Sequence, residues 1–272
     1  MIETNFPYDE DALRELELWP LFELQLSSLP PPHCPPMVAR VAVAPRTQGP
    51  ANAGEPTNVR ATPIRSPSTT PASAYAPDPE RVARIAALDW GALIAEAAAC
   101  TACGLCKQRK QAVVGAGAAD APWLFVGEGP GAEEDLQGEP FVGPAGKLLD
   151  AMLSAAGLQR GREVYIANVV KCRPPGNRNP SGDEALACAP LLDRQITLIQ
   201  PKLIVALGKI ALTRLTGSDA SMASMRGTLH EYRGIPVVAT YHPAYLLRNL
   251  PDKLKAWEDL MFAKRTLIAA KR

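Results

Sequence analysis

Three of the six cysteines in the chain stand at every third position, as Cys100, Cys103 and Cys106 in the stretch CTACGLC. The Cys-x-x-Cys spacing is typical of metal sites and of redox pairs. Two further cysteines, Cys172 and Cys188, occur later in the chain. Four thiolates bind either zinc or an iron–sulfur cluster, and sequence spacing does not separate the two. The pattern favours a metal site in which Cys106 is the spare, either as a replacement for any of the four ligands or simply as the end of the turn. Cys188 also suits a small core residue.

Acidic and imidazole side chains follow two apolar runs. GEGPGAEED at 127–135 contains Glu128 and Glu134, and its glycines let the backbone approach a ligand closely. The spacing matches neither a dinucleotide fingerprint nor a phosphate-binding loop. His242 directly follows another apolar run and precedes Pro243, whereas His230 stands in an ordinary turn context. These residues are candidates for acid–base chemistry, with a tight turn and a structural histidine as the alternatives.

A basic loop follows the second apolar run, with the sequence NVVKCRPPGNRNPSGDE at 168–184. It combines Asn168 with the cations Lys171, Arg173 and Arg178 on a backbone stiffened by prolines. Such a loop suits phosphate contacts, and a solvated loop is the alternative. Its SGDE segment is typical of the N-cap that opens a helix.

The elements that must position these residues alternate between strands and helices. Apolar or β-branched runs predict four strands, at 122–127, 163–170, 202–208 and 235–241. Helical spacing predicts helices over 80–99, 145–157, 181–200, 209–217 and 253–270. The alternation indicates an α/β fold with a mainly parallel sheet. Ligands bind beyond the carboxyl ends of such strands, where Glu128, Asn168 and His242 stand.

The chain divides into three parts. Residues 30–79 hold 13 of the 27 prolines and few large apolar residues, which predicts a disordered linker containing His33 and Cys34. Ahead of it, residues 1–29 form a short acidic leader that could contain a docking element. Residues 80–272 are predicted to be the folded domain.

Charge and hydropathy place limits on partners and compartment. The formal net charge is +1, but residues 1–89 carry 7 basic and 11 acidic side chains and the remainder carries 22 and 17. A mildly basic body allows a nucleic-acid partner. The acidic N-terminus and the lack of a long apolar run predict a cytoplasmic protein without a membrane partner, where disulfides are not favoured.

Taken together, these motifs resemble the family 4 uracil-DNA glycosylases, iron–sulfur enzymes of bacteria and archaea. The resemblance covers residues 100 to about 268 and rests on the motifs CTACGLC, FVGEGPGAEED, GEPFVGPAGKLLD, YIANVVKCRPPGNRNP, PKLIVALG and YHPAYLLRN. It implies a three-layer sandwich with a central, mainly parallel four-stranded sheet between helices. The disordered N-terminal tail lies outside the resemblance.

The resemblance also implies a [4Fe–4S] cluster. Its ligands would be Cys100, Cys103, Cys172 and Cys188, and the position of Cys106 is not a ligand in the family pattern. The cluster would clamp the segment before the first strand to the loop and helix after the second.

For the base, the resemblance implies a pocket that receives a flipped uracil. Phe141 would stack on the ring, Asn168 would read O4 and N3–H, and Gly127 and Gly129 would let the backbone approach. An amide carries one acceptor and one donor side by side, which match N3–H and O4 of uracil. Cytosine presents the reverse pattern.

For the reaction, the resemblance implies that His242 donates to O2 of the leaving uracil. A carboxylate would orient water or stabilise the cationic sugar. We prefer Glu128, because it directly follows the strand, and keep Glu134 as the contender.

For DNA, Leu247 and Arg248 would press into the gap left by the flipped base, and Lys147, Arg173 and Arg178 would contact phosphates. The expected partner is uracil-containing DNA, single- or double-stranded, bound by a monomer. QLSSLP at 25–30 loosely resembles the peptides with which bacterial repair proteins bind the sliding clamp.

Two other hypotheses compete with a turning-over glycosylase. One is a relative that captures uracil-DNA covalently, but that subgroup carries a basic, histidine-containing insert after FVGPAG, where this chain continues directly into KLLD. The other is a noncatalytic iron–sulfur accessory that only binds DNA. Formation of abasic sites separates both from the enzyme.

Overall fold

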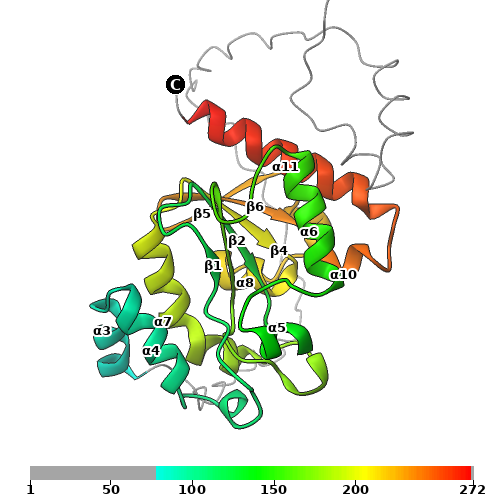
Figure 1. Ribbon diagram of the computed structural model, residues 1–272. Coiled ribbons are helices and arrows are strands. Elements are labelled where there is room, and N and C mark those ends of the chain that lie inside the picture. The colour runs from blue at the N-terminus through cyan, green and yellow to red at the C-terminus, as the bar shows by residue number, and fades with distance from the viewer. Residues whose placement is uncertain (1–77, 271–272) are drawn as a thin grey trace, which may run out of the picture.

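The computed structural model describes residues 78–270 (Figure 1). The leader and nearly all of the proline-rich segment, with His33, Cys34 and the QLSSLP stretch, lie outside the described residues.

A six-stranded sheet forms the centre of the fold, in the order β1-β3-β2-β4-β6-β5. The strands are β1 (Ala116–Gly117), β2 (Trp123–Gly127), β3 (Val164–Asn168), β4 (Leu203–Leu207), β5 (Leu229–Tyr232) and β6 (Ile235–Thr240). The four central strands run parallel, and β1 and β5 pair antiparallel at the two edges. The predicted mainly parallel sheet is confirmed, but the sheet has six strands and not four.

The two additional strands carry weak sequence signals. Strand β1 is two residues long, and β5 is half exposed, so neither produces an apolar run. A turn at Arg233 and Gly234 joins β5 to β6, and both residues have positive φ, 52° and 81°. Such a turn matches the twist of an antiparallel pair. His230, expected in a turn, therefore lies on an edge strand, where its Nε2 is 2.8 Å from the carbonyl oxygen of Met225.

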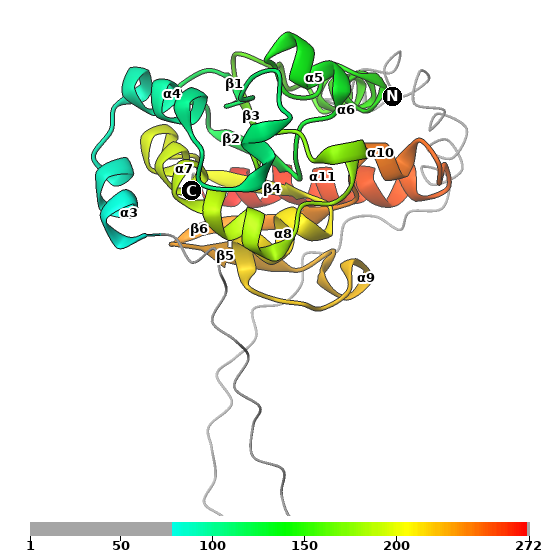
Figure 2. The same cartoon turned by 90° about the horizontal axis from the view of Figure 1, so that it is seen from below.

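Helices cover both faces of the sheet and confirm the three-layer arrangement (Figures 1 and 2). The longer helices are α3 (Pro79–Ala86), α4 (Trp90–Ala99), α6 (Pro144–Ala155), α7 (Gly182–Ile199), α8 (Lys209–Thr216) and α11 (Asp252–Ala269). Shorter ones are η1 (Gly104–Lys107), α5 (Ala132–Gln137), η2 (Pro175–Asn177), α9 (Met222–Met225) and α10 (Pro243–Leu246).

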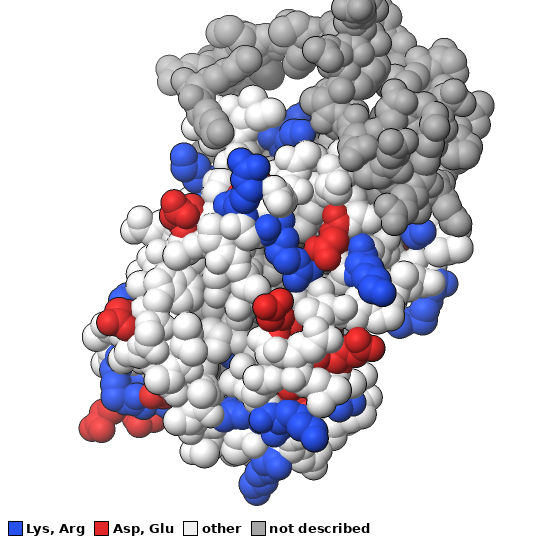
Figure 3. All heavy atoms as spheres, viewed as in Figure 1, with Lys and Arg blue, Asp and Glu red and all other residues white. Residues whose placement is uncertain are grey.

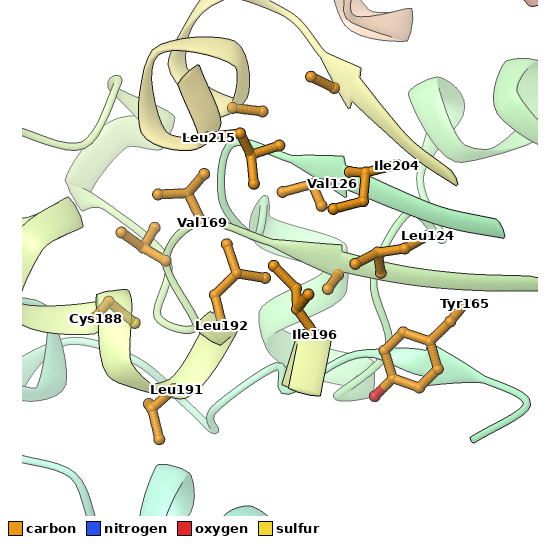
Figure 4. Packing of buried hydrophobic residues seen from close by; sticks show 14 of the residues in the cluster. Leu124, Val126, Tyr165, Val169, Cys188, Leu191, Leu192, Ile196, Ile204 and Leu215 are labelled. Atoms are coloured by element: carbon orange, nitrogen blue, oxygen red, sulfur yellow. The ribbon is translucent and has the colours of Figure 1, made fainter. Parts of the chain in front are cut away.

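Along the fully buried strands, successive side chains point to opposite faces of the sheet and so form two separate cores. On β2, Trp123 and Phe125 pack with α6 and α11, whereas Leu124 and Val126 point to the opposite face and pack with α3, α4, α7 and α8. Figure 4 shows the second core, in which Leu124, Val126 and Ile204 of the strands face Leu192 and Ile196 of α7 and Leu215 of α8. Both cores hold the carboxyl ends of the parallel strands in fixed positions.

Capping residues set where the helices begin. The helical pattern over 80–99 contains two helices and not one, because Asp89 caps α4 by accepting a hydrogen bond from the Ala92 amide at 2.8 Å. The predicted cap at SGDE is confirmed: Ser181 and Glu184 form a reciprocal capping box at the start of α7.

None of the helices in the described range 78–270 is long and apolar enough to cross a membrane. On the face drawn in Figure 3, basic side chains are interspersed with acidic ones.

Candidate active site and cysteine-lined cavity

A pocket of about 580 Å³ opens beyond the carboxyl ends of β2, β3 and β6. Its lining includes Glu128, Gly129, Glu134, Phe141, Asn168, Arg178, His242 and Arg248. Eight of the twelve expected substrate, catalytic and DNA residues therefore surround one cavity. The other four, Gly127, Lys147, Arg173 and Leu247, are outside its lining.

Asn168 is the last residue of β3 and is only 1% exposed. Its side-chain oxygen Oδ1 is buried without a hydrogen-bond partner. Gly127 pairs with Asn168 across the sheet, and a Cβ on Gly127 would lie 2.4 Å from Oδ1. Gly127 therefore leaves space for the amide, which is buried at the pocket and has an acceptor available for a ligand N–H.

Phe141 lies in a rare left-handed conformation, with φ of 56°. Arg160 donates to its carbonyl oxygen at 2.9 Å and to that of Pro140 at 2.7 Å. Gly146 lies so close that a Cβ there would be 1.8 Å from the same carbonyl oxygen. These contacts hold the Phe141 ring beside His242, with ring centres 5.4 Å apart. Neither Arg160 nor Gly146 carries a sequence signal for this role.

His242 caps the short helix α10, and its Nδ1 accepts a hydrogen bond from the Ala244 amide at 3.1 Å. Burial and, to a smaller extent, the charge of Arg248 lower the pKa of His242 to about 4, against the opposing effect of Glu134. The ring is therefore neutral at pH 7. Because Nδ1 accepts this hydrogen bond, the neutral ring carries its own proton on Nε2 and can donate from there.

The two candidate carboxylates differ in their partners. Glu134 accepts three main-chain hydrogen bonds at 3.1 Å, from Gly131, Val142 and Gly143, so its oxygens join the start of α5 to the loop after Phe141. The Glu128 carboxylate has no hydrogen bond or ion pair within residues 78–270. Burial raises the pKa of the Glu128 carboxyl. Glu128 is thus the carboxylate that remains available to a ligand.

The expected DNA-contacting cations have different surroundings. Arg178 is exposed but forms a bidentate pair with Glu184, at 2.7 and 2.8 Å. Arg173 donates to the side chain of Asn177 at 2.7 Å. Lys147 is exposed on α6. Beyond the end of α10, Leu247 is 43% exposed and Arg248 is also exposed.

A second cavity is lined by cysteines. Cys100, Cys103, Cys106, Cys172 and Cys188 all contribute to its wall. The fold thus brings CTACGLC, before the first parallel strand, to the loop and helix after β3. Cys188 lines this cavity and packs in the adjoining core, which supports both roles that its sequence position suggested.

Nitrogen donors point at three of the sulfur atoms. Arg81 donates to Cys100 Sγ at 3.4 Å and Arg109 to Cys172 Sγ at 2.8 Å. The main-chain N–H of Lys171 donates to Cys188 Sγ at 3.3 Å. Donors of this kind stabilise sulfur in its thiolate form, which is the form that binds metals.

The thiols themselves resist ionisation. Burial raises the pKa of Cys103, Cys172 and Cys188, for Cys188 to about 12. A metal that replaces the proton would overcome this effect. Within the described residues, no three His, Cys, Asp or Glu side chains converge on one point as a single-ion site would require. An iron–sulfur cluster needs a wider arrangement, because its cysteines bind different irons.

Lys171 has a different position from the one its sequence context indicated. It is 1% exposed, so it is not a surface phosphate ligand. Its Nζ donates to the main-chain carbonyl of Asn168 at 2.8 Å, and the residue lines the cysteine cavity. Burial lowers the pKa of Lys171 to about 8, and negative charge on Cys188 and Cys172 opposes this shift.

Comparisons with known proteins agree with this geometry. A model of the uracil DNA glycosylase superfamily matches residues 114–261. A type-4 uracil-DNA glycosylase from Thermotoga maritima is 48% identical over 61% of this chain and 88% of the relative. The type-4 enzyme of Sulfurisphaera tokodaii is 43% identical over 65% and 84%, and that of Saccharolobus solfataricus is 42% identical over 62% and 82%. The superfamily model covers more than half of the chain and the relatives are matched over most of their length, so this protein belongs to the type-4 uracil-DNA glycosylases.

Proposed function

We propose that the protein removes uracil from DNA by hydrolysing the N-glycosidic bond, which leaves an abasic site for repair. The observation that carries the proposal is Asn168 Oδ1, a buried acceptor without a partner at the pocket. A buried polar atom is costly unless a ligand satisfies it, and the N3–H of uracil is such a donor. The names of the type-4 relatives state the same activity.

Recognition begins when the base leaves the helical stack, because the duplex hides the anomeric carbon. Phe141 stacks on the uracil ring, and the amide of Asn168 pairs with N3–H and O4. Cytosine would present an acceptor at N3 and a donor at position 4, which leaves the amide unpaired in a buried site. Discrimination between the two bases follows from this mismatch.

The bond between N1 of the base and C1′ of the sugar breaks with its electron pair going to uracil. Negative charge develops on O2, and Nε2–H of His242 donates to it. The sugar becomes cationic, and the Glu128 carboxylate stabilises it and orients a water molecule for attack at C1′. The water forms the new C–O bond and its proton passes to Glu128.

Glu134 has a positioning role in this proposal. Its three hydrogen bonds fix Val142 and Gly143, next to the Phe141 ring. Its carboxylate is already occupied, which argues for Glu128 as the group that meets water.

Leu247 and Arg248 enter the gap that the flipped base leaves, since both are exposed next to the pocket wall that His242 forms. Lys147, Arg173 and Arg178 contact phosphates. Arg178 must exchange Glu184 for a phosphate, so its contribution is smaller than that of an unpaired cation.

Cys100, Cys103, Cys172 and Cys188 hold a [4Fe–4S] cluster in this proposal. The five-cysteine wall and the donors aimed at three sulfurs fit a group with several thiolate ligands. When bound, the cluster supplies a covalent link between the segment before η1 and the β3–α7 loop. Monomeric state, cytoplasmic location and clamp binding stay predictions.

The test uses full-length protein purified without oxygen, incubated with a labelled oligonucleotide that contains one uracil. Alkali-labile abasic sites should form with uracil and not with a thymine control, and iron and sulfide should be present in the same sample. Absence of abasic sites in an iron-loaded sample would overturn the activity. An SDS-stable protein–DNA adduct would instead establish covalent capture.

A further inference from the structure

Lys171 lines the cysteine cavity and hydrogen-bonds to a residue of the pocket wall, and it is neither a proposed cluster ligand nor a proposed base-binding residue. Its side chain is fully buried, with Nζ 2.8 Å from the carbonyl oxygen of Asn168. Its main-chain N–H is 3.3 Å from Cys188 Sγ, and its own carbonyl accepts from the Val113 amide at 2.8 Å. Lys171 is thus hydrogen-bonded through its ammonium group to Asn168, the proposed base-reading residue, and through its main-chain N–H to Cys188 of the cysteine cavity.

A buried ammonium group needs negative charge nearby, because desolvation of an unpaired cation is costly. Lys171 lines the same cavity as the thiols of Cys172 and Cys188, and its main-chain N–H contacts Cys188 Sγ. Thiolates bound to a metal keep their negative charge at neutral pH. Occupation of the cysteine site therefore supplies the counter-charge for this side chain.

The hydrogen bond to Asn168 lies where β3 ends. Beyond this residue the chain continues into the loop that carries Cys172, with Val169 and Val170 held by the carbonyl oxygens of Gly127 and Glu128. The Asn168 Oδ1 accepts no hydrogen bond, so the position of this oxygen depends on the main chain and on packing. The Lys171 ammonium is the charged donor that fixes this carbonyl.

We propose that Lys171 is a positioning residue that couples the metal-loaded cysteine site to uracil recognition by Asn168. The inference rests on the proposed function. It adds a second role for the cysteine site besides joining two segments. The negative charge of the metal-bound thiolates holds the Lys171 ammonium in place, and this ammonium orients Asn168 at the end of β3.

Arg109 provides a matched control. It also brings a cation to the cysteine site, through Nη1 to Cys172 Sγ at 2.8 Å, but its second hydrogen bond goes to the carbonyl oxygen of Ala98. Removing this side chain changes the charge around the cysteines without touching Asn168.

The experiment compares wild type, Lys171→Met and Arg109→Met, each full length and purified without oxygen. Three quantities are measured: iron and sulfide content, the rate of iron release to a chelator, and inhibition of excision by free uracil in the iron-loaded fraction. Both variants should release iron faster than wild type. Only Lys171→Met should weaken inhibition by uracil, about tenfold, as expected for one displaced hydrogen bond. Its KM should rise more than its kcat falls.

Equal inhibition by uracil in iron-loaded Lys171→Met and wild type would overturn the coupling. It would also be overturned if Lys171→Met and Arg109→Met weakened inhibition by uracil to the same extent. Loss of uracil excision by iron-loaded wild type would instead overturn the proposed function. If Lys171→Met does not fold, hydrogen exchange on the wild type decides. Mild removal of iron should then speed exchange of the Asn168–Lys171 amides more than that of β4, and unchanged protection would overturn the inference.

Discussion

The two cavities differ in whether their buried polar groups already have hydrogen-bond partners. In the pocket, Asn168 Oδ1 has no partner and the Glu128 carboxylate has none within the described residues. In the cysteine cavity, three sulfurs already accept hydrogen bonds from Arg81, Arg109 and the Lys171 main chain. The proposed function gives the pocket a ligand that exchanges and the cysteine cavity a group that stays bound, and this difference in hydrogen bonding fits both roles. Substitutions in the two regions should therefore differ in what they change.

Cys188→Ser should have the largest effect, because it removes one of the four proposed ligands of the [4Fe–4S] cluster. Iron and sulfide should fall to a small fraction of wild type, and the unfolding temperature should drop by about 10 °C, the scale of losing a covalent cross-link. Cys106→Ser is the matched control and should retain the metal. Metal loss in Cys106→Ser together with retention in Cys188→Ser would show that the ligand assignment is wrong. Iron analysis and thermal unfolding measure both.

His242→Ala should lower kcat by roughly 10²–10³-fold, the scale of losing one donor to a developing oxyanion. Iron content should stay at the wild-type value, since the side chain lies in the pocket. Single-turnover excision of uracil measures the rate. Turnover near that of wild type would refute the role of Nε2.

Glu128→Gln should lower the rate about 100-fold, within the range for an acid–base group, whereas Glu134→Gln should act mainly through the position of Phe141. In the proposed mechanism Glu128 works in its ionised form, and burial raises its pKa, so activity should fall with falling pH earlier than for an ordinary glutamate. His242, with a pKa of about 4, stays neutral above pH 5 and adds no inflection there. A pH–rate profile checks this, and Glu128→Gln should lose the acid limb. Retention of that limb would contradict the assignment.

Arg178→Ala should have the smallest effect, a two- to threefold loss of DNA affinity, because Glu184 competes with the phosphate. Lys147→Ala should reduce the slope of log affinity against log salt by about one, as for a full phosphate contact. Fluorescence anisotropy at several salt concentrations compares them. A larger change for Arg178→Ala would reverse this ranking of the cations.

The sequence predicts the four central strands because each is a continuous apolar run between two covered faces. It misses β1 and β5 because a two-residue strand and an exposed edge produce no such run. It places Glu128, Asn168 and His242 correctly at strand ends, since strand ends follow from strand assignment. It prefers Glu128 for its place after the strand but keeps Glu134 as the contender, because the difference between the two carboxylates depends on main-chain N–H groups from three separate positions.

Lys171 shows a further limit of the same kind. In sequence it is one cation among three in a proline-rich loop, which indicates phosphate contacts. Its burial depends on how that loop packs against parts of the chain distant in sequence, such as the segment before β1 in which the Val113 amide donates to the Lys171 carbonyl, and no local pattern records such packing. The Arg160 clamp on Phe141 is hidden from the sequence for the same reason.

The most direct test of the account is Asn168→Ala, assayed with single-stranded oligonucleotides that contain uracil or cytosine. Wild type should excise uracil and leave cytosine intact. The variant should lose about 100-fold in uracil excision, as expected when hydrogen bonds to N3–H and O4 are both absent, with iron content and unfolding temperature close to wild type. A variant that excises uracil at the wild-type rate would contradict the central claim that this buried amide reads the base.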